Sequence, residues 1–251
     1  MKKLLLFLLP LICFTTIRCG EKCGDCGFEP QGVMNLNFKP LLDGKPFVIN
    51  QVYNLAGKNV RFTKLAFYLT QACPSRASGT LDCIANTYFI DLTTLDDSTK
   101  AAKGFTQVMT QIGEGNQTGL QVGYGVKKSL NVSTPKDFVS SNPLSNADYY
   151  WADWKSYIFV KLEGSMDKDG DGRFETGITL HTGGDDSFRP TWFPKSFTVD
   201  TKGSTTLNFD VNINTILRGI DLTTVNSTHQ TGDKPTMLKM MDNLKDAVIL
   251  K

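Results

Sequence analysis

Alternating hydrophobic and polar residues mark much of the chain after residue 31. The pattern runs through Met34–Phe38, through Leu65–Thr70 and most strictly through Leu207–Ile213, where Asn and Asp fill the polar positions. Successive side chains of a strand point to opposite faces, so a period of two predicts half-buried strands. We expect the last of these segments to be a half-exposed antiparallel strand.

Two further segments predict more deeply buried strands. Tyr157–Glu163 is almost continuously apolar, as expected for a central strand covered on both faces, and Tyr88–Leu92 is a shorter apolar run. Turn residues such as Asp43-Gly44 and Lys202-Gly203 separate the strand segments. The chain therefore contains many short strands joined by turns.

Helical periodicity is confined to the end of the chain. Met237, Met241, Leu244 and Val248 recur at helical spacing and give one apolar face, with Pro235 near the first turn. A poorer helix is expected over residues 135–139. Many strands and few helices predict an all-β fold: an antiparallel β-sandwich with Ig-like layering and a short C-terminal helix.

The first 18 residues are expected to be a signal peptide of the lipoprotein type. Lys2 and the lysine after it form a short basic N-terminal region. The apolar run Leu4–Ile17 that follows is too short to span a membrane comfortably. Cys19 follows, and we expect it to carry the lipid anchor, although Arg18 stands where a small residue is usual. Ordinary secretion is the alternative. Lipidation predicts attachment to a membrane, in the periplasm or at the outer-membrane surface of a Gram-negative-type bacterium.

Residues 19–31 are expected to form a flexible tether, and residues 32–251 one β-domain long enough to enclose a full core. The formal net charge of +2 and the lack of a Lys/Arg cluster give no case for nucleic-acid binding. The sequence has no nucleophile elbow and no phosphate-binding glycine loop. These observations predict a protein that is not an enzyme.

Four cysteines follow Cys19. Cys73 and Cys83 flank a Pro/Ser/Gly loop, and in an oxidising compartment they predict a disulfide that stabilises the fold by about 3 kcal/mol. Cys23 and Cys26 form a C-x-x-C in the tether. A local disulfide is favoured there, because a zinc site needs a second ligand pair.

An acidic segment contains the start of a calcium-binding loop. Asp167, Asp169 and Asp171 alternate before Gly172, and carboxylates at this spacing can converge on one hard cation. Position twelve is an isoleucine and no helices flank the segment, so it is not an EF-hand. We expect a candidate calcium site completed by Glu175, Asp185 or Asp186; a solvated hairpin turn is the alternative.

The chain has two histidines. His181 ends a β-rich stretch, and His229 lies in a polar loop before the C-terminal helix. Imidazole suits copper, zinc, iron and nickel, and two imidazoles are too few for structural zinc but can hold Cu(I). Spacing alone does not show that the two side chains meet, and exposed or core histidines are the alternative.

An aromatic cluster, Tyr149-Tyr-Trp-Ala-Asp-Trp154, lies before the predicted central strand. It is compatible with a carbohydrate-binding or redox-active surface. Aromatic side chains are usually largely buried, so packing against the edge of the sandwich is favoured.

Read in order, these segments resemble the methanobactin-associated copper-binding protein (MbnP)-like family. The resemblance covers residues 32–250 and is most specific in the aromatic cluster and the strand that follows it. The matching segments are Phe62–Leu69, Gly123–Val126, Leu130-Asn131, Pro135, Asn142–Leu144, Tyr150–Gly164, His181–Gly184 and His229–Leu250. Ser156 departs from the glycine that the family often has there.

The resemblance implies an exported β-sandwich that binds copper through His181 and His229. It also implies an oxidised tryptophan two residues before the first histidine and a di-haem peroxidase-like partner that makes it. Thr179 stands at that position and has no ring to oxidise, which leaves Trp151, Trp154 or Trp192 as spatial substitutes. The competing hypothesis is a structural or interaction lipoprotein that keeps the fold and has lost the metal site. Imidazoles more than about 8 Å apart would favour that hypothesis, because both must lie about 2 Å from one metal.

Overall fold

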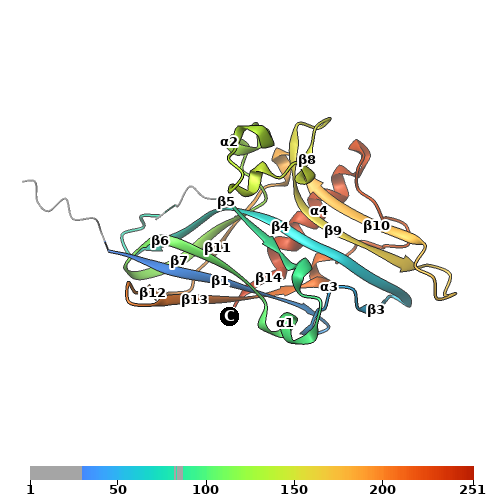
Figure 1. Ribbon diagram of the computed structural model, residues 1–251, viewed down its shortest axis with the longest axis horizontal. Coiled ribbons are helices and arrows are strands. Elements are labelled where there is room, and N and C mark those ends of the chain that lie inside the picture. The colour runs from blue at the N-terminus through green and yellow to red at the C-terminus, as the bar shows by residue number, and fades with distance from the viewer. Residues whose placement is uncertain (1–29, 82, 84–86) are drawn as a thin grey trace, which may run out of the picture.

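The computed structural model describes residues 30–81, 83 and 87–251 and confirms the predicted all-β fold. Two sheets form the molecule (Figure 1). The five-stranded sheet has the order β14-β13-β1-β2, with β6 also paired to β1. The nine-stranded sheet has the order β10-β9-β4-β7-β11, and β3, β5, β8 and β12 pair with its members.

The strands of the smaller sheet are β1 (Gln31–Leu42), β2 (Lys45–Pro46), β6 (Phe105–Gly113), β13 (Ser204–Asn212) and β14 (Val248–Leu250). Those of the larger sheet are β3 (Val52–Leu55), β4 (Lys58–Arg76), β5 (Thr87–Asp91), β7 (Gly115–Tyr124), β8 (Tyr150–Trp151), β9 (Ser156–Asp167), β10 (Thr176–Gly183), β11 (Arg189–Phe193) and β12 (Phe197–Val199). The α-helices are α1 (Ser98–Lys103), α2 (Lys128–Asn131), α3 (Ile213–Ile216) and α4 (Lys234–Ala247).

The strand predicted over Leu207–Ile213 differs in two ways from the expectation. β13 pairs antiparallel with β14 but parallel with β1, so the smaller sheet is mixed. The strand also ends at Asn212, whose side chain accepts a hydrogen bond from the backbone N–H of Thr215 and caps α3. Ile213 therefore begins a helix, because a capping asparagine stops the ladder one residue earlier than the apolar pattern does.

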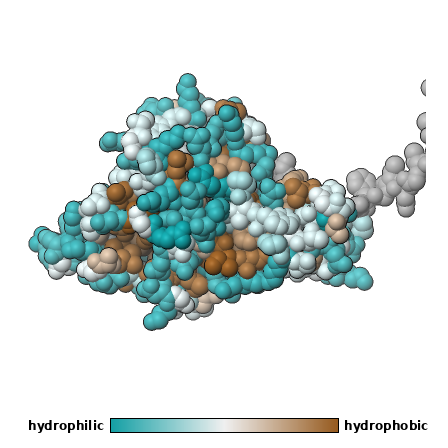
Figure 2. Space-filling model, turned by 180° about the vertical axis from the view of Figure 1, so that it is seen from behind, coloured by the Kyte–Doolittle hydropathy of each residue, from teal (hydrophilic) through white to brown (hydrophobic). Residues whose placement is uncertain are grey.

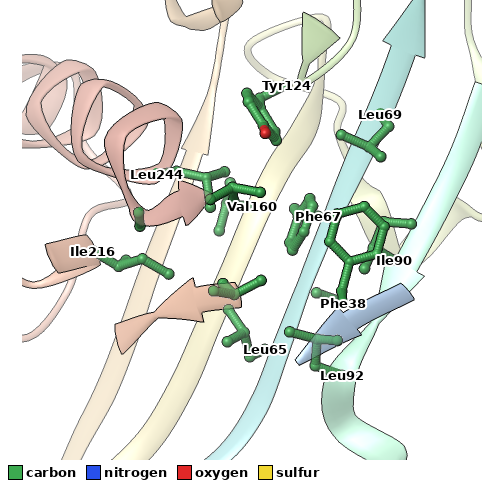
Figure 3. Close-up of a cluster of buried hydrophobic side chains, with 14 of the residues drawn as sticks. Phe38, Leu65, Phe67, Leu69, Ile90, Leu92, Tyr124, Val160, Ile216 and Leu244 are labelled. Atoms are coloured by element: carbon green, nitrogen blue, oxygen red, sulfur yellow. The ribbon is translucent and has the colours of Figure 1, made fainter. Parts of the chain in front are cut away.

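The core lies between the sheets. Phe38 of β1 packs edge-on against Phe67 of β4, with ring centroids 5.9 Å apart, and stacks on Phe209 of β13 at 5.1 Å. Leu244 and Ile216 enter the same core from the helices (Figure 3). All five side chains are almost completely buried, so the alternating positions of both sheets form one continuous apolar layer.

Helix α4 occupies the place predicted for the C-terminal helix, but it ends at Ala247, and Val248, predicted on its apolar face, begins β14 instead. The helix runs behind β9 and β10 (Figure 1) and buries Met240, Met241 and Leu244. The helix expected over residues 135–139 is only a 3₁₀ turn over Pro135–Asp137. Thr134 and Asp137 cap that turn and the chain is extended again at Phe138, so no second helical turn forms.

The predicted disulfide between Cys73 and Cys83 is present. It closes a loop of sequence separation 10 at the end of the long strand β4. The expected signal peptide, the cysteine predicted to carry a lipid (Cys19), the Cys23–Cys26 pair and nearly all of the predicted tether lie outside the described residues.

Hydrophilic side chains predominate on one face of the molecule (Figure 2). On the face drawn in Figure 2, apolar side chains form small groups separated by hydrophilic ones. No helix within the described ranges is long and apolar enough to cross a membrane.

Candidate metal centre

Strand β10 places His181 on the outer face of the larger sheet. Ile178 and Leu180 point into the core and are fully buried, so Thr179 and His181, one residue out of phase, face the other way. The neighbouring strand β9 pairs Glu163 with Thr179 and Lys161 with His181. These four residues therefore share one patch of the outer face.

A segment of the loop before α4 extends this edge of the sheet and carries His229. The backbone N–H of Thr179 donates to the carbonyl of Asn226 at 2.7 Å, and the N–H of Thr228 donates to the carbonyl of Thr179 at 3.1 Å. The Thr228 hydroxyl accepts from the N–H of His181 at 2.8 Å and donates to its carbonyl at 2.6 Å. This pairing fixes the register of the loop and places His229 beside His181.

The two imidazoles meet. Nε2 of His229 lies 2.7 Å from Nδ1 of His181, across a sequence separation of 48, and the ring centroids are 4.6 Å apart. Both nitrogens of a two-histidine metal site lie about 2 Å from the ion and hence at most about 4 Å from each other. The observed spacing is within that limit, so the donor atoms fit a shared transition metal after the hydrogen bond between the rings is broken.

Glu163 holds the other nitrogen of His181. Its Oε1 lies 2.7 Å from Nε2 of His181, and the Nζ of Lys161 lies 3.9 Å from the same oxygen. A carboxylate only accepts hydrogen bonds, so Nε2 carries the proton and Nδ1 presents its lone pair toward His229. A histidine ligand oriented in this way by a carboxylate is a recurrent feature of metal sites.

Glu163 was not among the residues expected from the sequence. It lies in the Leu162-Glu163-Gly164 part of the segment that resembles the family, and that motif was the available signal. Glu163 and Lys161 are two residues apart on β9, and side chains at that spacing point to the same face of a strand. Both polar side chains therefore lie on the outer face.

Burial sets the charge of this patch. His181 is 6 % exposed, and this desolvation lowers the pKa of its imidazole to about 4, against an opposing effect of the hydrogen bond to Glu163. Desolvation likewise lowers the pKa of Lys161, whose Nζ lies 4.5 Å from the centre of the Tyr149 ring. His181 is therefore neutral near pH 7, which is the protonation state that a metal ligand requires.

The aromatic cluster is packed against this patch. The ring of Trp151 lies 6.2 Å from His181 and 6.1 Å from His229, and the ring of Trp154 is 4.8 Å from that of Trp151. Tyr149 is buried, as the packing interpretation predicts, but both tryptophans remain partly exposed. Trp192 lies on β11, at the opposite edge of the sheet from β10. Of the three tryptophans, Trp151 is thus the one whose ring is near both imidazoles.

Thr179 has a structural contact in place of a ring. Its hydroxyl donates to the Ser227 hydroxyl at 3.1 Å, and its backbone pairs with the same loop. The side chain is therefore committed to joining β10 to the loop that carries His229.

A pocket of about 420 Å³ lies near this centre, although neither histidine lines it. Its lining includes Gly183 and Thr231, each two residues from one of the histidines, together with Trp154, Asp186 and Lys234. His229 is exposed, so the centre is open to solvent at this residue. A larger, mostly apolar pocket of about 460 Å³ next to α3 contains none of the residues predicted for function.

The acidic loop joins β9 to β10, so it is flanked by strands, as expected. Ligand oxygens of Asp167, Asp169, Asp171 and Glu175 all lie within 4.8 Å of one another. Asp167 is buried and accepts from the backbone N–H of Gly170 at 2.7 Å and of Gly172 at 3.1 Å. Gly172 has φ +87°, which confirms the sharp turn that the glycine permits.

Of the three alternatives expected to complete this acidic group, Glu175 lies in it, and Asp185 and Asp186 do not. Both follow β10, whereas the acidic loop precedes it, so the length of the strand separates them. Asp185 accepts a hydrogen bond from Asn131, and Asp186 pairs with Lys234. The alternating carboxylates and the one at position 175 form the group without them.

Comparison with known proteins identifies a family and a solved structure of similar fold. The model of the MbnP family matches residues 31–231. The structure of MbnP from Methylosinus trichosporium aligns with a TM-score of 0.55 and 16% identity, over 81% of this chain and 83% of that one. At this identity the alignment shows a shared fold. No curated protein sequence matches the chain.

Proposed function

The chain belongs to the MbnP family, and from this premise we propose that it is an exported, lipid-anchored copper-binding protein with His181 and His229 as ligands. The observation that carries the proposal is the opposed pair of ring nitrogens, 2.7 Å apart, one buried and oriented by a carboxylate and the other open to solvent. Such a pair is preorganised for a metal that arrives from outside.

Copper in the Cu(I) state fits the donors best. The centre offers two imidazoles and, within the described residues, no thiolate close to them: Cys73 and Cys83 are joined in a disulfide on β4 and the loop after it. Structural zinc requires four ligands, whereas Cu(I) accepts fewer. Bound copper supplies a soft cation, which the protein would carry or present.

We propose binding and not catalysis. In the part of the chain that the structure describes, neither imidazole is hydrogen-bonded to a Ser hydroxyl or a Cys thiol; the two rings bond to each other, and His181 also bonds to Glu163. An activated nucleophile needs such a contact to its base. Because Thr179 has no ring to oxidise, a di-haem peroxidase-like protein would act on this chain only if Trp151 or Trp154 were its target.

The test is copper retention. The purified protein is loaded with Cu(I) under reducing conditions and dialysed, and copper per chain is measured. We expect about one ion per chain in the wild type and a loss of most of it in the His181→Ala/His229→Ala variant. A matched Asp169→Asn/Asp171→Asn variant should retain copper. Equal retention in the wild type and the histidine variant would contradict the proposal.

Export and anchoring are tested at Cys19. A Cys19→Ala variant expressed in a Gram-negative host should move from the membrane fraction to the soluble or unprocessed fraction, because the thiol that takes the lipid is missing. A variant that stays in the membrane fraction after processing would contradict lipid anchoring.

The acidic loop supports a second, independent binding function. The convergence of four carboxylates around a glycine turn favours a hard cation such as calcium. We propose that the loop binds calcium whether or not the histidine centre is filled. If the histidines bind no metal, a calcium-binding surface module with the family fold is the alternative function.

A further inference from the structure

Trp151 is the aromatic side chain that lies next to both histidines. Its ring centre is 6.2 Å from that of His181 and 6.1 Å from that of His229, nearly equal distances. It reaches this place from β8, which is distant in sequence from both histidines. The indole therefore lies beside the space between the two imidazoles.

Contacts with neighbouring residues hold the indole of Trp151 in this place. A Cβ on Gly183 would lie 2.8 Å from Cζ3 of Trp151, so the glycine two residues after His181 leaves room for the ring. Trp151 pairs with Ser156 in the β8–β9 hairpin, and the ring of Trp154 packs against it at 4.8 Å. Backbone pairing, the missing side chain and an aromatic neighbour thus hold the ring from different sides.

The polar side chains of this patch are already engaged. Glu163 accepts from His181, the Thr179 hydroxyl donates to Ser227, and the Thr228 hydroxyl bonds to the backbone of His181. A cation held by two imidazoles thus has the indole as its neighbour. The plane of His229 is at 82° to that of Trp151, which is compatible with an ion in the His229 plane lying over the indole face.

We propose that Trp151 is the third component of the metal centre, and that its indole face covers a soft monovalent cation, Cu(I) or Ag(I), held by the two histidines. This inference rests on the proposed function. Trp has the most favourable ring for binding a cation through its face. The same ring offers no lone pair to Zn²⁺, which needs further N, O or S ligands. Trp151 therefore favours soft monovalent ions over Zn²⁺.

Tryptophan fluorescence gives a direct test, because the chain has only three tryptophans. In a Trp154→Phe/Trp192→Phe variant, all indole emission comes from Trp151. Titration with Ag(I), which is not redox-active under these conditions, should quench and shift this emission and saturate at about one ion per chain. The same variant with His181→Ala and His229→Ala added should show no saturable change.

Affinity measurements complete the test. Trp151→Leu should weaken Ag(I) and Cu(I) binding by about tenfold and leave Zn²⁺ binding unchanged, with Trp151→Phe between Leu and wild type. Trp192→Phe is the matched control, since Trp192 lies at the far edge of the sheet, and it should bind as the wild type does. Circular dichroism establishes that each variant is folded.

The outcomes separate the two hypotheses. Ag(I) binding, measured by calorimetry, without a change in Trp151 emission would overturn the role of Trp151 and leave the histidine site intact. So would a folded Trp151→Leu variant with wild-type Ag(I) affinity. A wild-type protein that binds neither Ag(I) nor Cu(I) would overturn the proposed function itself, and this inference with it.

Discussion

The Oε1 atom of Glu163 lies 2.7 Å from Nε2 of His181, and this contact decides which nitrogen of the histidine faces His229. It turns Nδ1 toward the partner ring, 2.7 Å away, and leaves it without a proton. A half-buried side chain on β9 thus sets the chemistry of the buried histidine on β10.

Substitution of Glu163 tests this orientation. Glu163→Ala should lower Cu(I) affinity by about 10- to 100-fold, because a group that hydrogen-bonds and orients a ligand histidine contributes that much. Glu163→Gln keeps an accepting oxygen and should lose less. Competition with a coloured Cu(I) chelator measures both. Glu175→Gln, in the acidic loop, is the control, and a Glu163→Ala protein with unchanged affinity would contradict the role of Glu163.

The metal-free protein should lose stability as pH falls through the range in which His181 titrates. Burial lowers the pKa of the folded His181 from 6.5 to about 4, so between these values the unfolded state binds more protons. The contribution of the neutral His181 to the free energy of unfolding is fully present above pH 6.5 and decreases as the pH falls toward 4. The total loss is at most about 3 kcal/mol.

Urea unfolding across this pH range measures the effect in the wild type and in His181→Gln. The wild type should lose more stability than the variant as the pH falls, because the variant lacks the titrating ring. A stability difference between the two that stays constant with pH would show that His181 is not the group responsible.

The Thr228 hydroxyl should be essential to the position of His229. Thr228 is fully buried, and Thr228→Val leaves the N–H and carbonyl of His181 without this partner, at a cost of about 1–3 kcal/mol. Copper retention should fall as well, because the loop is no longer held in register. Thr228→Ser keeps the hydroxyl and should stay close to wild type in thermal unfolding and copper content. Equal loss in both variants would assign the effect to packing.

Removal of the Cys73–Cys83 disulfide should lower the free energy of unfolding by about 3 kcal/mol, since it closes a short loop in the unfolded chain. Thermal unfolding of Cys73→Ala/Cys83→Ala against the wild type measures this. A reducing agent should destabilise the wild type and leave the variant unchanged. If it destabilises both equally, another disulfide is involved.

Calcium should raise the melting temperature of the wild type and not that of Asp169→Asn/Asp171→Asn. Binding to the folded state alone stabilises it by about 2.7 kcal/mol when calcium is 100-fold above its Kd. Asp169 and Asp171 are exposed, so the calcium-free proteins should melt alike. Asp185 lies beyond the far end of β10, so the Asp185→Asn variant should keep the calcium response. Loss of the response in that variant would contradict the assignment to the acidic loop.

Local patterns determined much of this protein from the sequence alone. The period of two predicted which face of β1, β4 and β13 is buried. The apolar run predicted the buried strand β9, and the spacing of methionines and leucines predicted helix α4. The order of motifs gave the family, which the family model confirms. Which strands pair with one another could not be predicted in the same way. The parallel pairing of β1 with β13 joins segments far apart in the chain, and no local pattern encodes it.

The candidate centre was decided by tertiary structure. The sequence positions of two isolated histidines do not reveal the distance between them. That distance depends on the backbone pairing of residues 226–228 with Thr179 and on the hydrogen bonds of the Thr228 hydroxyl to the backbone of His181. Glu163 and Trp151 join the centre for the same reason: β10 and β8 pair with β9 only in the folded molecule. Sequence periodicity assigns a side chain to a face of its own strand, whereas only the order of strands in the sheet determines which side chains share that face.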